Sequence, residues 1–136
     1  MNRVRILAAL FIDTIALRQV EGPSTRIDLG GLKFSEAAPG PFPITIEPHL
    51  VVLVHCPIGE KDEAALEVTY HRGDEQIARN VQLLQVEAGK FNYRLVRAEL
   101  TFDEPGTVEA RCRLDMGEAL TVPFAVLPPA PATPPP

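Results

Sequence analysis

The sequence has 136 residues, of which 46% are hydrophobic and 23% are charged, and these fractions are those of a single globular domain. The formal net charge is −5 and no block of clustered lysine and arginine is present, so we do not expect nucleic-acid binding, which requires neutralised phosphates. No apolar run reaches the length of about 18 residues that a membrane-spanning helix needs, so we expect no membrane partner.

The N-terminal stretch MNRVRILAALFID has two arginines before a short apolar run, as a signal peptide would. Asp13 ends this run, however, and no small-x-small cleavage pattern follows it. The pattern therefore favours a buried first strand over an export signal, and we expect a cytoplasmic protein.

Short apolar or alternating segments separated by turn residues follow one another along the whole chain. We expect strands at residues 5–12, 25–34, 41–46, 49–56, 65–72, 94–102, 107–115 and 119–127. Residues 77–86 fit no single pattern. This spacing predicts an all-β, antiparallel sandwich of about seven to nine strands over residues 1–127.

The stretch FDEPGTVEARCRLD, residues 102–115, places a cysteine between two arginines, which suggests either a reactive thiol or a core strand. Val108, Ala110 and Cys112 share one strand face, whereas Arg111 and Arg113 share the other. We therefore expect a core strand whose thiol points inward.

A hairpin between residues 94–102 and 107–115 keeps the apolar faces together. A five-residue loop sets Phe102 opposite Val108 and leaves one like-charged pair, Arg97 with Arg113, which is fewer than a three-residue loop leaves. The following hairpin is expected to pair Leu114 with Leu120, which also places Cys112 beside Val122.

Cys56 and Cys112 both have the parity of their strands' apolar faces. In an exported immunoglobulin-type adhesion domain, two such cysteines would form the central disulfide. The chain has no tryptophan to pack on such a bridge, so two reduced, buried thiols are the expected state and the exported, bridged domain is an alternative.

Three histidines and a cysteine, at positions 49, 55, 71 and 56, suggest a metal site, but their spacing argues against one. His49 and His55 lie about 20 Å apart along one strand, which is too far to share an ion.

The two serines lie outside any G-x-S-x-G motif, and no phosphate-binding loop is present. We expect a non-enzyme without catalytic residues, metal or cofactor; a small hydrolase or metal-dependent enzyme using His55, His71 and nearby acids is the alternative.

Two strands are apolar on both faces, although a sandwich strand normally has one apolar face on the core and one polar face in solvent. Leu7, Ala9 and Phe11 lie opposite one apolar set, and Val51 and Leu53 lie opposite another. A helix, a long loop such as residues 73–92, or another chain must cover these five residues, and a second chain is the expected cover because large apolar patches usually mark an interface. The sequence therefore predicts a non-catalytic binding or assembly module whose partner is itself, as a homodimer, or another protein.

The tail PPAPATPPP, residues 128–136, contains P-x-x-P twice without a flanking basic residue. This composition predicts an extended, solvated end.

The layout as a whole resembles an uncharacterised family of short bacterial proteins, often actinobacterial, that is known only as a domain of unknown function. The features that carry the likeness are Asp13 after the first strand, the Gly-Gly at 30–31, PFPITI, the GDE turn and VPFAV before the proline-rich tail. The resemblance implies an immunoglobulin-like β-sandwich in a cytoplasmic bacterial protein, and it supplies no activity and no functional residues.

Overall fold

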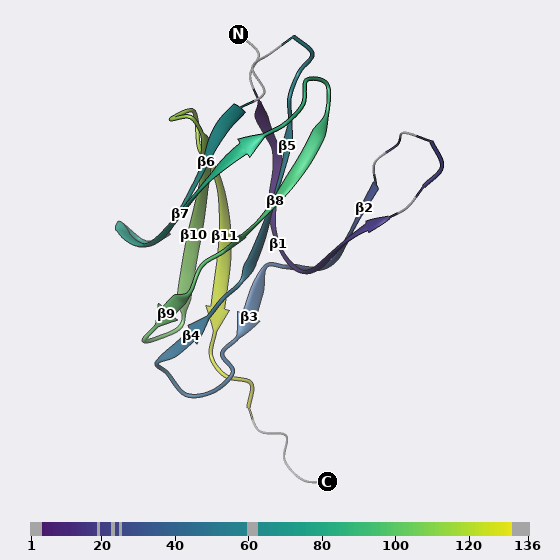
Figure 1. Cartoon of the computed structure of the whole chain (residues 1–136). Coiled ribbons are helices and arrows are strands. Elements are labelled where there is room, and N and C mark those ends of the chain that lie inside the picture. Colours follow the sequence, from purple (N-terminus) through teal and green to yellow (C-terminus); the bar gives the residue numbers. More distant parts are fainter. Residues whose placement is uncertain (1–3, 19, 23, 25, 60–62, 132–136) are drawn as a thin grey trace.

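The computed structural model describes residues 4–18, 20–22, 24, 26–59 and 63–131, and in this part of the chain the regular structure consists of strands alone. Eleven described strands form two packed sheets and one small two-stranded sheet (Figure 1). The fold is therefore an all-β sandwich, as the alternation and turn spacing predicted, but its eleven described strands exceed the predicted seven to nine.

The strands divide between three sheets. Sheet I contains, in spatial order, β2 (Arg26–Lys33), β1 (Arg5–Arg18), β5 (His49–His55) and β8 (Phe91–Arg97). Sheet II contains β3 (Ser35–Ala37), β11 (Leu120–Leu127), β10 (Gly106–Leu114), β6 (Glu63–Arg72) and β7 (Glu75–Gln85). The third sheet pairs β4 (Ile44–Ile46) with β9 (Leu100–Phe102). Because β3 runs parallel to β11, the prediction of a wholly antiparallel sandwich is wrong at this edge of sheet II.

The core lies between the inner faces of sheets I and II. Leu50 and Val52 of β5 and Val108 of β10 are completely inaccessible to solvent. The ring of Phe11 from sheet I lies 4.9 Å from the ring of Phe124 from sheet II, so the two sheets are in direct contact. Burying one such side chain contributes about 1.5–3 kcal/mol, so this interior is the main source of stability.

The parity predicted for β10 is confirmed. Val108, Ala110 and Cys112 are fully buried, whereas Arg111 and Arg113 lie half-buried on the outer face of sheet II. The cysteine between two arginines is therefore part of a core strand.

The predicted hairpin between residues 94–102 and 107–115 is wrong. Its first half is divided between β8 in sheet I and β9 in the small sheet, and β10 pairs instead with β6 and β11. The pairing with β6 sets Glu67 directly opposite Arg113, where the predicted hairpin would have set Arg97. An opposite-charge pair thus replaces a like-charged one.

The last hairpin keeps the predicted faces but differs in register by two residues. Cys112 pairs with Leu120 and not with Val122. The longer turn is fixed by Asp115, which has a positive φ of 47° and whose carboxylate accepts a hydrogen bond of 2.9 Å from the backbone N–H of Ala65. A shift of two residues leaves every side chain on its predicted face.

β1 has an irregularity at Leu7, between the pairs made by Ile6 and Ala8. Such an extra residue reverses the alternation along the strand. Ala9 and Phe11 consequently face the core, and the prediction that they lie on the opposite face is wrong.

The second half of β1 extends beyond the sandwich and pairs there with β2. We call residues 12–18 and 26–32 the arm, and Figure 1 shows that this hairpin points away from the two packed sheets. Gly31 lies at its base with a φ of +65°, against the side chain of Asp13, which occupies the space that a Cβ would need. A glycine is therefore required where the arm leaves the sandwich.

Two further segments complete the described chain. Residues 77–86, whose pattern predicts no single structure, lie mainly in β7, at the edge of sheet II. Residues 128–131 have no regular structure, and the rest of the proline-rich tail, 132–136, lies outside the described residues.

Candidate functional site

The side of sheet I that faces away from the core, which we call the outer face, is apolar across three strands. Val51 lies at its centre and pairs with Leu10 on β1 and with Leu95 on β8. The next position outward on β5, Leu53, pairs with Tyr93 on β8. Val51 is completely covered by its surroundings, whereas the other four side chains are only half-buried and present apolar surface to solvent.

The ends of the outer face differ in polarity. At one end the side chain of Phe91 is 61% exposed and its ring lies 4.5 Å from the ring of His55, and Leu7 in the neighbouring β1 irregularity is 50% exposed. At the other end, His49 pairs with Arg97. Because the charged and polar groups lie at the margins, the centre of the face is suited to contact with another apolar surface.

The five residues expected at an interface therefore have different positions. Val51 and Leu53 lie on the outer face, and Leu7 is exposed in the irregularity. Ala9 and Phe11 are buried in the core, so they are removed from the candidate interface.

The contribution of β8 to this face was missed by sequence reasoning. Phe91, Tyr93 and Leu95 alternate and share one face of the strand. The available signal was this alternation, but the predicted strand begins at residue 94, so Phe91 and Tyr93 lie outside it, although Val96 is buried as its alternation predicts.

The histidines proposed for an alternative catalytic or metal site are not brought together. His55 lies on the outer face of sheet I, whereas His71 lies on the outer face of sheet II, where its Nε2 is 2.8 Å from Oγ1 of Thr69. The body of the sandwich separates the two rings. Among the described residues, no group of three or more His, Cys, Asp or Glu side chains is arranged to hold a metal ion.

Both cysteines are completely buried, and no disulfide joins them. Burial raises the pKa of the Cys112 thiol to about 12. Because the thiolate is the nucleophile, a thiol that stays protonated at neutral pH and is closed to solvent is unreactive.

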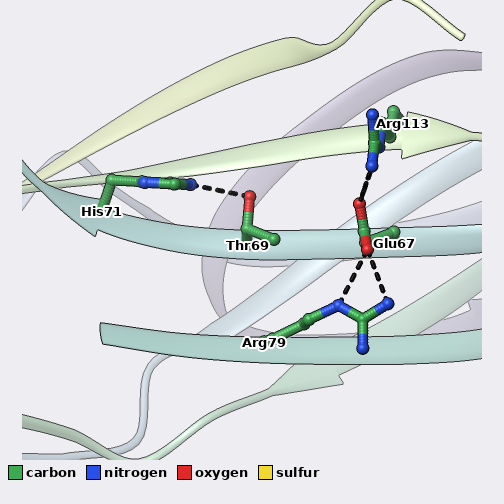
Figure 2. Close-up of polar contacts among 5 residues, drawn as sticks. All are labelled: Glu67, Thr69, His71, Arg79 and Arg113. Carbon is green, nitrogen blue, oxygen red and sulfur yellow. Dashed lines mark hydrogen bonds and ion pairs between the residues drawn. The ribbon is translucent and has the colours of Figure 1, made fainter. Parts of the chain in front are cut away.

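The outer face of sheet II is polar, and Figure 2 shows its main contacts. Glu67 on β6 lies between Arg79 on β7 and Arg113 on β10, with nitrogen–oxygen distances of 2.8 Å and 2.6 Å. Hydrogen bonds from Arg79 and then Arg113 hold the pKa of Glu67 below its ordinary value. These cross-strand ion pairs make the centre of the outer face of sheet II polar, and Val81 and Leu83 are exposed beside them on the edge strand β7.

A hollow of about 250 Å³ lies at the base of the arm. Its lining residues are Ile12, Asp13, Lys33, Glu36, Ile46, Glu47, Pro48 and His49. The ammonium group of Lys33 lies 2.8 Å from Asp13 and 3.2 Å from Glu36, and these carboxylates, Asp13 first, raise its pKa above the ordinary value. Lys33 is thus held as a cation that ties β2 to β1 and β3, which is a structural task.

No protein-family model matches the chain, and no curated protein sequence matches it significantly. Within the described residues, no helix has the length and apolar character needed to cross a membrane.

Proposed function

We propose that the protein is a non-catalytic binding and assembly module, and that it associates with itself through the outer face of sheet I. The observation that carries this proposal is the contrast between the two sheets. The outer face of sheet II carries ion pairs around Glu67, with exposed Val81 and Leu83 beside them on the edge strand β7, whereas that of sheet I is apolar at its centre, from Leu10 through Val51 to Leu95. A second copy that packs on this face removes its apolar surface from water, which is the main driving force of protein association.

The state of the reactive side chains supports a role without catalysis. The Cys112 thiol is inaccessible to solvent and has a raised pKa, and Lys33 is held protonated between carboxylates. Neither side chain is therefore activated as a nucleophile. His55 and His71 lie on opposite faces of the sandwich, so they cannot form one acid–base pair.

We also propose that the sandwich is immunoglobulin-like. The order β1–β5–β8 corresponds to strands A, B and E of that fold, and β11–β10–β6–β7 corresponds to G, F, C and C′. Cys56 directly after β5 and Cys112 on β10 then occupy the places of the cysteines that bridge strands B and F, and Tyr70 on β6 takes the place of the buried tryptophan. Unbridged thiols are the rule in a reducing compartment, which agrees with the cytoplasmic, bacterial setting that the layout suggests.

The test is a pair of matched substitutions on opposite sides of the sandwich. Phe91→Glu places a charge on the outer face of sheet I, and Leu83→Glu places the same charge at an exposed apolar position of β7 in sheet II. Dissociation constants come from multi-angle light scattering and sedimentation velocity, and circular dichroism verifies that both variants fold.

We expect Phe91→Glu to weaken self-association by about tenfold or more, because it forces a charge into an apolar contact, whereas Leu83→Glu leaves it unchanged. Equal effects of the two variants would show that the outer face of sheet I is not the contact. If the wild-type chain is monomeric at high micromolar concentration, the proposed self-association is wrong, and the module would instead bind a different protein.

A further inference from the structure

We propose that the apolar face of the arm in one copy packs on the outer face of sheet I in a second copy, and that the two copies exchange arms reciprocally. This inference rests on the proposed self-association and specifies how the two copies meet.

The arm has one apolar face. Its two strands pair Ile15 with Leu29 and Leu17 with Ile27, so these four side chains lie on the same side of the hairpin. Leu17 is 66% exposed, and the other three are half-buried. β2 is an edge strand that pairs with β1 alone among the described strands, and Figure 1 shows the arm projecting away from the two packed sheets.

The opposite face of the arm is polar. The guanidinium group of Arg18 forms an ion pair with the carboxylate of Asp28 on the facing strand, with a nitrogen–oxygen distance of 2.9 Å. Thr14 and Ala16, on the same side, are exposed. The alternation is that of a hairpin with one buried face and one solvated face. A two-stranded hairpin alone is marginally stable in water, so the apolar face of the arm requires a cover.

Geometry favours the outer face of sheet I as that cover. With about 7 residues per strand, about 3.3 Å per residue and about 4.8 Å between strands, the apolar face of the arm measures roughly 23 by 10 Å. The outer face of sheet I spans β1, β5 and β8 and is therefore about 14 Å wide, which is enough to accept an arm about 10 Å wide. Both surfaces are apolar sheet faces without central charges, so they can stack as the two layers of a sandwich do.

The area required by a dimer favours the reciprocal contact. Two arms that packed only against each other would bury about 500 Å² of flat surface in total, well under the roughly 1,200 Å² at which stable interfaces begin. Two reciprocal arm-on-sheet contacts bury about 900 Å² of flat surface, which is nearly twice as much and closer to that area. Reciprocity also closes the assembly as a two-fold dimer, whereas one-way docking would propagate into a filament.

The first test compares neighbouring positions on the two faces of the arm. Leu17→Glu charges the apolar face, and Ala16→Glu makes the same change on the solvated face, one residue away. We expect Leu17→Glu to raise the dimer dissociation constant by about tenfold or more, and Ala16→Glu to change it by less than about twofold. Equal constants for the two variants would overturn the role of the arm while leaving a dimer in place.

The second test identifies the surface that the arm touches. Chains carrying Leu17→Cys are mixed with chains carrying Leu7→Cys, at the margin of the outer face, or Leu83→Cys, on sheet II, and are treated with a short bifunctional thiol reagent. The native cysteines are buried and do not compete. We expect cross-links between positions 17 and 7 and not between positions 17 and 83.

Each result of the cross-linking has a definite meaning. If the main cross-link joins position 17 of one chain to position 17 of the other, the arms pack against each other. The arm-on-sheet contact is then wrong, although self-association stands. If the wild-type chain has a monomer mass, the proposed function fails first, independently of the cross-links.

Discussion

Replacement of Tyr70 by phenylalanine is expected to stabilise the protein. Tyr70 is completely buried on β6, and its hydroxyl has no hydrogen-bond partner within the described part of the chain. Burial raises the pKa of this hydroxyl well above its usual range, so it is a neutral polar group in the core. A buried polar group without a partner costs about 1–3 kcal/mol, whereas phenylalanine keeps the packing of the ring and removes only one oxygen atom.

We therefore expect Tyr70→Phe to raise the free energy of unfolding by about 1 kcal/mol and Tm by about 3–5 °C. Urea unfolding followed by circular dichroism measures this, with all proteins at one concentration because self-association adds to apparent stability. Tyr93→Phe, a half-buried position on the outer face, is the control and should change stability by less than about 0.5 kcal/mol. A loss of 1 kcal/mol or more for Tyr70→Phe would refute the reasoning, because it would mean that the hydroxyl makes a favourable bond in the core.

Three further predictions concern the base of the arm, the polar row and the thiols. Gly31→Ala should destabilise more than Gly73→Ala: both glycines have a left-handed φ, which costs alanine about 1 kcal/mol, but only at Gly31 is the space for a Cβ occupied, and equal losses in urea unfolding would contradict this. Arg79 and Arg113 hold the pKa of Glu67 below its ordinary 4.5, so its stabilising effect is complete above that pH and is lost as the pH falls through the lower, folded value. The difference in urea midpoint between wild type and Glu67→Gln should accordingly shrink as the pH falls from about 5 to about 3, and a constant difference would count against the pairing. A thiol reagent should react with neither cysteine in the native protein and with both after unfolding without reductant; an absence of reaction after unfolding would indicate a disulfide.

The parts of the fold that depend on local alternation could be predicted from the sequence. Val108, Ala110 and Cys112 are buried as expected, because side chains alternate strictly along a regular strand. The two-sided apolar character of β5, with Val51 and Leu53 opposite the core set, likewise identified the outer face of sheet I. This pattern is carried by one strand and needs no knowledge of its neighbours.

The parts that depend on long-range pairing or on a break in alternation could not be predicted in this way. The extra residue at Leu7 reverses the faces of Ala9 and Phe11, and no residue type in that apolar run indicates it. β10 pairs with β6, about 40 residues earlier in the chain, because the segment between β8 and β10 crosses from one sheet to the other. The arm was missed because the first strand was expected to end at residue 12, although the isoleucine and leucine alternation on both sides of EGPST is typical of a hairpin.

The central claim is that the outer face of sheet I joins two copies of the chain, and the mass of the unmodified protein in solution tests it most directly. Sedimentation equilibrium over a range of micromolar concentrations should give a mass near twice the chain mass of 14.9 kDa, which falls toward 14.9 kDa on dilution. A mass of 14.9 kDa at every concentration would contradict the account.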